Sequence, residues 1–99
     1  MAERKLKPIH PGEVLREEFL KPFGISEEGL AQSIGASVQS IREIVSEKQS
    51  VTADTALRLA KFFGTSAQFW LGLQSEYDLD VMRERLGSKL EKEIVPLAA

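Results

Sequence analysis

The 99-residue chain is 42% hydrophobic and 28% charged, a balance typical of a folded domain with a single core. It contains no cysteine, which excludes disulfides and thiolate metal sites. Its formal net charge of −2 argues against broad affinity for nucleic acid, because domains with such affinity are usually basic. No apolar run is long enough to span a bilayer and the N-terminus lacks the apolar part of a signal peptide, so we expect a soluble, cytoplasmic protein.

The chain begins with a basic stretch, residues 1–10, that contains a proline and has no apolar period. We expect a flexible arm, either a disordered start or a segment that orders on phosphates or on a protein partner. Residues 11–23 form the first predicted helix, because Pro11 suits an N-terminal helical position and Gly24 follows its end. His10 is then expected to be an exposed residue beside the start of this helix.

Two short amphipathic patterns occupy residues 26–46, with a serine before each and Gly35-Ala36 between them. Ser26 and Ser37 suit N-caps, because a serine hydroxyl accepts a backbone N–H of the first turn. Gly35 suits the sharp exit from the first helix, where a positive φ is usually required. Helix, tight turn and second helix indicate a helix-turn-helix unit, although capped amphipathic helices also form plain hairpins in all-α bundles.

The exposed face of the second helix contains polar side chains that could reach base edges or phosphates in a major groove. Arg42 is the first candidate for such a contact, and Lys48 is placed to meet a phosphate. The candidate DNA-binding residues are Ser37, Gln39, Ser40, Arg42, Glu43 and Lys48. Against this interpretation, residues 22–51 contain two basic side chains and four carboxylates. Ser37 is also a cap, and Arg42 could instead pair with Glu43 or Glu47.

Two further helices are predicted, one capped by Thr52 and running through Phe63, and one opened by Ser66. The second of these helices contains three adjacent large apolar residues, Phe69, Trp70 and Leu71. Successive side chains on a helix point in different directions, so these three cannot all face one core. A second subunit would cover what the core does not, so we expect a homodimer. The candidate dimer-interface residues are Phe69, Trp70, Leu73 and Tyr77.

Residues 79–99 form an amphipathic extension that Gly87 is expected to interrupt, and its apolar end at residues 94–97 either packs on the body or frays. The sequence therefore predicts an arm at residues 1–10, a helix-turn-helix domain at residues 11–78 and a C-terminal helical extension at residues 79–99. Catalysis is not expected, because the chain has no cysteine, one histidine and no glycine-rich phosphate loop after a strand. We expect neither a cofactor nor a metal.

Three motifs resemble those of HigA-type (VapI-like) antitoxins, which belong to the Xre or phage-repressor helix-turn-helix family. They are residues 9–20 (IHPGEVLREEFL), residues 52–61 (TADTALRLAK) followed by GTS, and residues 69–74 (FWLGLQ) followed by YDL at residues 77–79. The resemblance covers about residues 8–80, and the motifs occur in the family's order.

This resemblance implies an all-α, five-helix, phage-repressor-like (lambda-repressor-like) DNA-binding domain with a C-terminal helical extension. It also implies the antitoxin of a type II toxin–antitoxin pair, which binds and neutralises a HigB/RelE-like mRNA endonuclease. Such proteins usually bind double-stranded operator DNA as homodimers and repress their own transcription. The helices of the unit would lie at residues 27–34 and at residues 37 to about 46.

The chain departs from the family pattern at a few positions of the helix-turn-helix unit. Glu27 stands where the family often has glutamine, Glu43 where a basic residue is common, and Glu47 where many members have glycine. Gly29 stands where a stronger helix former is usual. Two alternatives therefore remain open, namely a transcriptional regulator without a toxin and an antitoxin that has lost DNA binding.

Overall fold

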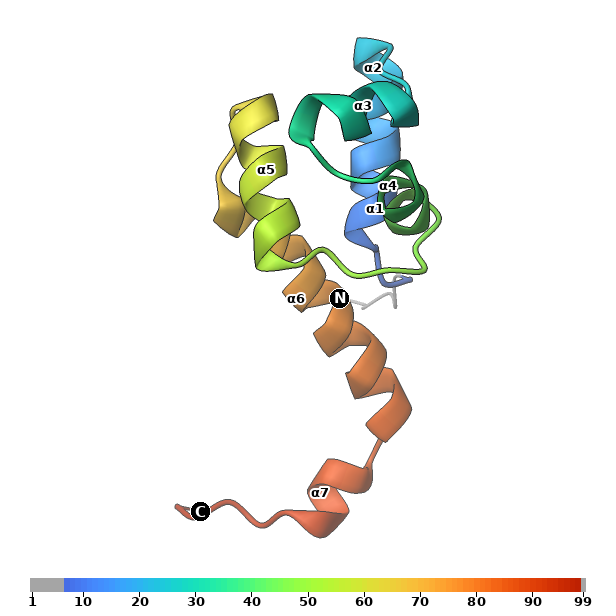
Figure 1. Ribbon diagram of the computed structural model, residues 1–99. Coiled ribbons are helices and arrows are strands. Elements are labelled where there is room, and N and C mark those ends of the chain that lie inside the picture. Colours follow the sequence, from blue (N-terminus) through green and yellow to red (C-terminus); the bar gives the residue numbers. More distant parts are fainter. Residues whose placement is uncertain (1–6, 99) are drawn as a thin grey trace.

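The computed structural model describes residues 7–98, so most of the predicted N-terminal arm lies outside the described residues. The described part is helical and contains no strand. Its elements are α1 (Pro11–Val14), η1 (Leu15–Leu20), α2 (Lys21–Phe23), α3 (Glu27–Ile34), α4 (Val38–Val45), α5 (Ala53–Phe63), α6 (Ala67–Leu86) and α7 (Lys89–Glu93). Figure 1 shows α1 to α5 gathered into a bundle, with α6 beginning on the bundle and extending away from it. The all-α prediction is confirmed.

The first predicted helix is present as α1, η1 and α2, which follow one another without a break from residue 11 to residue 23. The middle part, η1, is a π-helix, and at its end the Lys21 N–H donates to the Arg16 carbonyl, five residues back. Pro22 follows directly, and a proline lacks the N–H of a regular α-helical bond and crowds the carbonyl four residues before it. The wider turns of the π-helix therefore lie just before Pro22, and proline is the residue type that a regular α-helix tolerates least.

His10 corrects the expectation of an exposed residue, because its side chain is only 3% exposed. It is the N-cap of α1, and its Nδ1 accepts the Gly12 N–H at 2.9 Å. Its ring packs edge-on against Tyr77 of α6, with 4.8 Å between ring centroids. Sequence spacing does not reveal this contact, since Tyr77 lies far along the chain.

Burial lowers the pKa of His10 below its ordinary value of 6.5, although the charges of Glu47 and Asp78 oppose that shift. The unfolded chain therefore binds a proton more readily than the folded protein does just below pH 6.5. We expect the free energy of unfolding to be constant above that pH and to fall as the pH drops through the lowered pKa. Chemical denaturation between pH 7.5 and 5 measures this. His10→Asn keeps a capping side chain and should lose this pH-dependent component, whereas an unchanged profile would contradict the assignment.

The predicted caps of the helix-turn-helix unit are present. Ser26 Oγ accepts the Gly29 N–H at 2.9 Å, and Ser37 Oγ accepts the Ser40 N–H at 3.0 Å. Gly35 ends α3 with a φ of 72°, in the left-handed region that glycine adopts without strain. These local bonds fix where α3 ends and where α4 begins.

The core forms where helices α1 to α6 meet. Its largest fully buried side chains are Trp70, Leu15, Leu30, Ile41, Ile44 and Leu59. Trp70 has no exposed surface, and its Nε1 donates to Thr65 Oγ1 at 2.8 Å. The prediction that Trp70 lies in a dimer interface is therefore wrong. Of the three adjacent apolar residues, Trp70 faces the core of its own protomer while Phe69 remains 39% exposed.

Helix α6 is longer than expected, with 20 residues that continue past residue 78, where we placed the end of the domain. It ends at Gly87, which has a φ of 55°, as predicted for an interruption at that residue. Its first half packs on α5 and α1, and its second half extends beyond the bundle (Figure 1). The apolar end of the chain does not pack on the body, since Val95 is 83% exposed and Leu97 is fully exposed. Among residues 7–98, no helix has both the length and the apolar composition to cross a membrane.

Candidate nucleic-acid interface

Helix α4 buries one face and exposes the other. Ile41, Ile44 and Val45 belong to the core, whereas Gln39 and Arg42 on the opposite side are exposed. The other candidate DNA-binding residues lie around this exposed face: Ser37 and Lys48 are exposed, and Ser40 and Glu43 are partly buried. The structure thus places all six candidates on α4, its N-cap or the loop that follows it.

Several of these polar groups already have partners. Gln39 Nε2 donates to Glu43 Oε2 at 2.8 Å, one turn further along α4. Ser40 Oγ accepts a bond from Gln49 Nε2 at 3.1 Å, which joins α4 to the following loop. Because a hydroxyl can also donate, Ser40 retains a donor for a base or a phosphate. The bond from Gln39 to Glu43 uses one of the two N–H donors of the Gln39 amide, so its other donor and its Oε1 can serve a base contact without an exchange of partners.

Arg42 pairs with helix α3 and not with the neighbours on its own helix that the sequence suggested. Its Nη2 donates to Glu28 Oε2 at 2.8 Å, and its Nε lies 3.7 Å from Glu27 Oε1. The Glu28 backbone N–H, followed by the Arg42 guanidinium, lowers the pKa of the Glu28 carboxyl below its ordinary value. The side chain of Arg42 remains 52% exposed, so it still faces solvent on the outer side of the unit.

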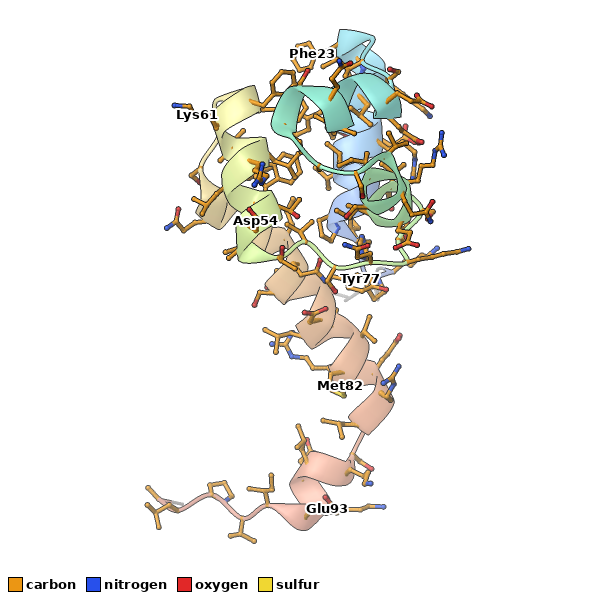
Figure 2. The ribbon with its side chains drawn as sticks, viewed as in Figure 1. Phe23, Asp54, Lys61, Tyr77, Met82 and Glu93 are labelled. Carbon is orange, nitrogen blue, oxygen red and sulfur yellow. The ribbon has the colours of Figure 1, made fainter. Side chains whose placement is uncertain are left out.

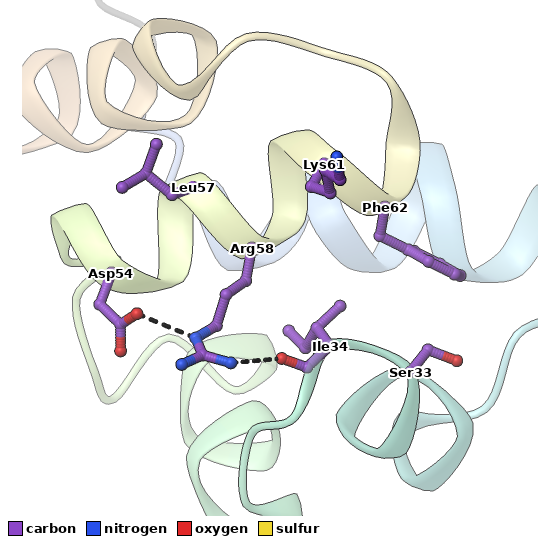
Figure 3. A pocket seen from close by; sticks show the side chains of 7 residues that line it. All are labelled: Ser33, Ile34, Asp54, Leu57, Arg58, Lys61 and Phe62. Atoms are coloured by element: carbon purple, nitrogen blue, oxygen red, sulfur yellow. Dashed lines mark hydrogen bonds and ion pairs between the residues drawn. The ribbon is translucent and has the colours of Figure 1, made fainter.

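Two arginines outside the predicted site hold the helix-turn-helix unit in place. Arg16 of η1 donates from Nη1 to the Val45 carbonyl at 2.6 Å, at the C-terminal end of α4. Arg58 of α5 donates from Nη1 to the Ile34 carbonyl at 2.8 Å, at the end of α3, while its Nε bonds Asp54 (Figure 3). Each arginine satisfies a carbonyl that has no partner within its own helix. The sequence analysis did not single out either residue.

Arg58 also crosses a groove of about 540 Å³ between α3 and α5. Figure 3 shows its guanidinium between Asp54 and the end of α3, with Leu57 and Phe62 on either side of it along α5. No group of three or more His, Asp or Glu side chains in residues 7–98 is arranged to hold a metal.

The loop after α4 has an unusual backbone and a buried anchor. Glu47 has a φ of 68° and is the one residue of the described chain, glycines aside, with a positive φ. Glycine adopts this left-handed conformation more readily than glutamate does. Further along, the Val51 N–H donates to Oε1 of the buried Gln74 at 2.8 Å, and Gln74 Nε2 donates to Asp78 at 3.0 Å. Gln74 therefore links the loop to α6, a role that the sequence analysis missed.

The remaining dimer-interface candidates are partly available on the surface of α6. Phe69 is 39% exposed and Leu73 is partly buried, whereas Tyr77, which is labelled on α6 in Figure 2, packs on His10 of its own protomer. Further along α6, Leu79 is 47% and Met82 is 42% exposed. Residues 79, 82 and 86 are spaced by three and four, so they share one face of the helix. That face lies on the part of α6 that extends beyond the bundle.

A bundle of short helices that presents α4 beside α3 defines a helix-turn-helix DNA-binding domain. The sequence profile described as Helix-turn-helix (HTH_3) matches residues 17–70. Virulence-associated protein I of Dichelobacter nodosus is 49% identical over 82 residues, which cover 83% of this chain and 76% of that protein. Antitoxin HigA-1 of Vibrio cholerae is 34% identical over 85 residues, which cover 86% of this chain and 80% of HigA-1.

A solved structure of Pseudomonas aeruginosa antitoxin HigA with the higBA promoter has a TM-score of 0.88 at 48% identity, covering 92% of this chain and 99% of that one. The chain belongs to the HigA-type (VapI-like) antitoxin family of helix-turn-helix proteins. Members of this family are DNA-binding regulators and not enzymes.

Proposed function

We propose that this protein is the antitoxin of a type II toxin–antitoxin pair that represses its own operon as a homodimer and neutralises a HigB/RelE-like mRNA endonuclease. The observation that carries the DNA-binding half is the exposed polar face of α4, which caps and arginine bonds fix beside α3. The similar Pseudomonas HigA, solved with promoter DNA, supports promoter binding by this protein. On this proposal, α4 is the recognition helix.

The candidate residues divide by the kind of contact their side chains can make. Arg42 and Gln39 project from the exposed face, where a guanidinium suits guanine and an amide suits adenine. Ser37 and Ser40 lie in the first turn of α4 and suit phosphate or base contacts, while Lys48 suits phosphate alone. Glu43 suits a cytosine amino group, because the bond from Gln39 uses only part of its acceptor capacity.

Operator binding is tested by fluorescence anisotropy with DNA from upstream of the gene. Because few cationic groups lie on this surface, we expect log K to fall with log salt at a shallow slope, about −0.9 for each phosphate neutralised. A slope as steep as that of a highly basic repressor would contradict the proposed contact set. The absence of any binding would favour the alternative of an antitoxin without DNA binding, which the pairing of Arg42 with Glu28 also suits.

We further propose that the homodimer forms through α6 and the residues that follow it. The two recognition helices would then lie about 34 Å apart, one DNA turn. Exposed Leu79 and Met82 on the extending half of α6 provide apolar surface for a partner, with Phe69 and Leu73 nearer the bundle. Such a dimer would bury apolar side chains that are exposed to water in the described protomer.

Met82→Glu is expected to shift the protein from dimer to monomer at micromolar concentration, because a buried carboxylate without a partner opposes association. Sedimentation velocity measures the shift, and circular dichroism verifies that the helices persist. Met82→Leu, which keeps an apolar side chain of similar volume, is the matched control and should remain dimeric. A Met82→Glu protein that still dimerises would place the interface elsewhere.

The toxin-binding half is tested independently of DNA. The product of the neighbouring gene is co-expressed with this protein, and both a pull-down and rescue of growth are measured. Rescue by a variant that no longer binds the operator would separate the two activities. If no neighbouring gene product binds, the stand-alone regulator is the better description.

A further inference from the structure

The guanidinium of Arg42 lies between the recognition helix and two carboxylates of another helix. Most ion pairs of residues 7–98 join close neighbours on one helix, as Lys21 does with Glu17 and Arg83 with Asp80. Arg42 instead reaches from α4 to the first turn of α3, where Glu28 accepts a hydrogen bond at 2.8 Å and Glu27 lies within ion-pair distance. The ends of the two helices are fixed by serine caps, so the carboxylates stand in a defined position relative to Arg42.

We propose that Glu28, assisted by Glu27, is a positioning residue for Arg42 that suppresses sequence-independent DNA binding and so raises specificity for the operator. This inference rests on the proposed use of α4 as the recognition helix. It assigns a role to two acidic residues that would otherwise only weaken a DNA-binding surface.

The carboxylates beside Arg42 reduce the positive charge that this surface presents to DNA. Binding to arbitrary DNA depends almost wholly on cations that neutralise phosphates and release counterions. A guanidinium that already faces two carboxylates contributes little net positive charge to this attraction. Ionised Glu28 and Glu27 also cannot donate to a phosphate oxygen, because a carboxylate only accepts hydrogen bonds. The ion pair therefore lowers the part of the affinity that does not depend on sequence.

The bond to Glu28 also orients the Arg42 guanidinium. A guanidinium has five donors, and the bond to Glu28 occupies one of them, which leaves enough for a two-bond contact with guanine. A free arginine on a surface must lose much rotational freedom when it binds a base. Held by Glu28, Arg42 has lost part of that freedom before DNA arrives. The ion pair therefore weakens the binding of Arg42 to a phosphate more than it weakens the binding of Arg42 to a base.

The test is a double-mutant cycle of wild type, Glu28→Gln, Arg42→Ala and the double variant. Affinities are measured for the operator and for a scrambled duplex of equal length, over a range of salt concentrations. Glu28→Gln should raise affinity for the scrambled duplex about tenfold and steepen its salt slope by about 0.9, equivalent to one added phosphate contact. Operator affinity should change less, so the ratio of the two affinities falls. In the Arg42→Ala background, Glu28→Gln should have about a twofold effect or less, since the freed arginine is absent.

An equal gain from Glu28→Gln in both backgrounds would overturn the proposal, because the effect would then belong to the charge of Glu28 alone. A readout without DNA gives a second criterion, namely the NMR order parameter of the Arg42 Nε–H bond. It should drop to below roughly 0.6, the range of flexible groups, in Glu28→Ala, which removes the acceptor that a glutamine would keep. An order parameter equal to that of wild type would contradict the positioning role. The Glu28 side chain is 62% exposed, so both Glu28 variants are expected to fold, and their melting curves verify this.

The outcomes separate this inference from the proposed function. If wild type binds no operator but Glu28→Gln gains binding that needs Arg42, operator repression is wrong, the suppression of DNA binding by Glu28 stands, and the gain in operator specificity is overturned. If wild type binds the operator and the cycle shows no coupling, operator binding stands and the positioning role is wrong. If no variant binds any duplex, both are overturned.

Discussion

Replacing Gly12 with alanine is expected to lower the free energy of unfolding by about 3 kcal/mol, the upper part of the range for inserting a group into a packed site. The Cβ of an alanine at this position would overlap the backbone carbonyl oxygen of Ile44 and lie 2.8 Å from its carbonyl carbon. Because the obstacle is backbone and not a flexible side chain, a rotamer change cannot relieve it. Helices α1 and α4 must separate. Urea denaturation at 25 °C measures the loss.

Gly72→Ala is the matched control, because an added Cβ there meets nothing within 4 Å and the residue lies inside α6. It should stabilise the protein by up to about 1 kcal/mol through helix propensity. Since Ile44 belongs to α4, Gly12→Ala should also weaken operator binding under conditions where the variant is still folded. A Gly12→Ala protein as stable as wild type would show that α1 and α4 are further apart than described.

Arg42→Ala is expected to weaken operator binding by about 1–3 kcal/mol, or roughly 5-fold to 150-fold, if its guanidinium contacts a guanine. The effect on a scrambled duplex should be smaller, because Glu28 and Glu27 already offset the charge of Arg42. Anisotropy titrations with both duplexes measure the difference. Arg83→Ala removes the same charge from the extending part of α6 and should leave operator affinity nearly unchanged. Unchanged operator affinity in Arg42→Ala would remove this residue from the base-contacting set.

Local patterns in the sequence were sufficient to predict the helix-turn-helix unit. Serine caps, a glycine exit and apolar residues at helical spacing act within a few residues of one another, so their consequences can be read from the chain. The buried positions Ile41 and Ile44 follow from the same periodicity. The resemblance to known antitoxins added the family, which the comparisons confirmed.

Contacts between helices were much harder to predict. Periodicity identifies the residues that share a face of one helix, but not the face of another helix that they meet. His10 was therefore expected outside and lies against Tyr77. For Arg42 the alternative to a DNA contact was a pair with Glu43 or Glu47, whereas it pairs with Glu28. Trp70 was assigned to a partner subunit, although the core of its own protomer has room for it. In each case the missing information was tertiary.

The buried amide of Gln74 joins the segment that follows α4, the proposed recognition helix, to α6, the helix proposed for self-association. The exposed side chains of α4 would then determine which bases are bound. The tilt of α6 would determine the separation of the two operator half-sites. These properties reside in different parts of the chain and can diverge independently. A related repressor could acquire a new operator sequence through a few exchanges on α4 and keep its half-site spacing. A change in the pitch or length of α6 would instead alter the spacing and leave the choice of bases intact.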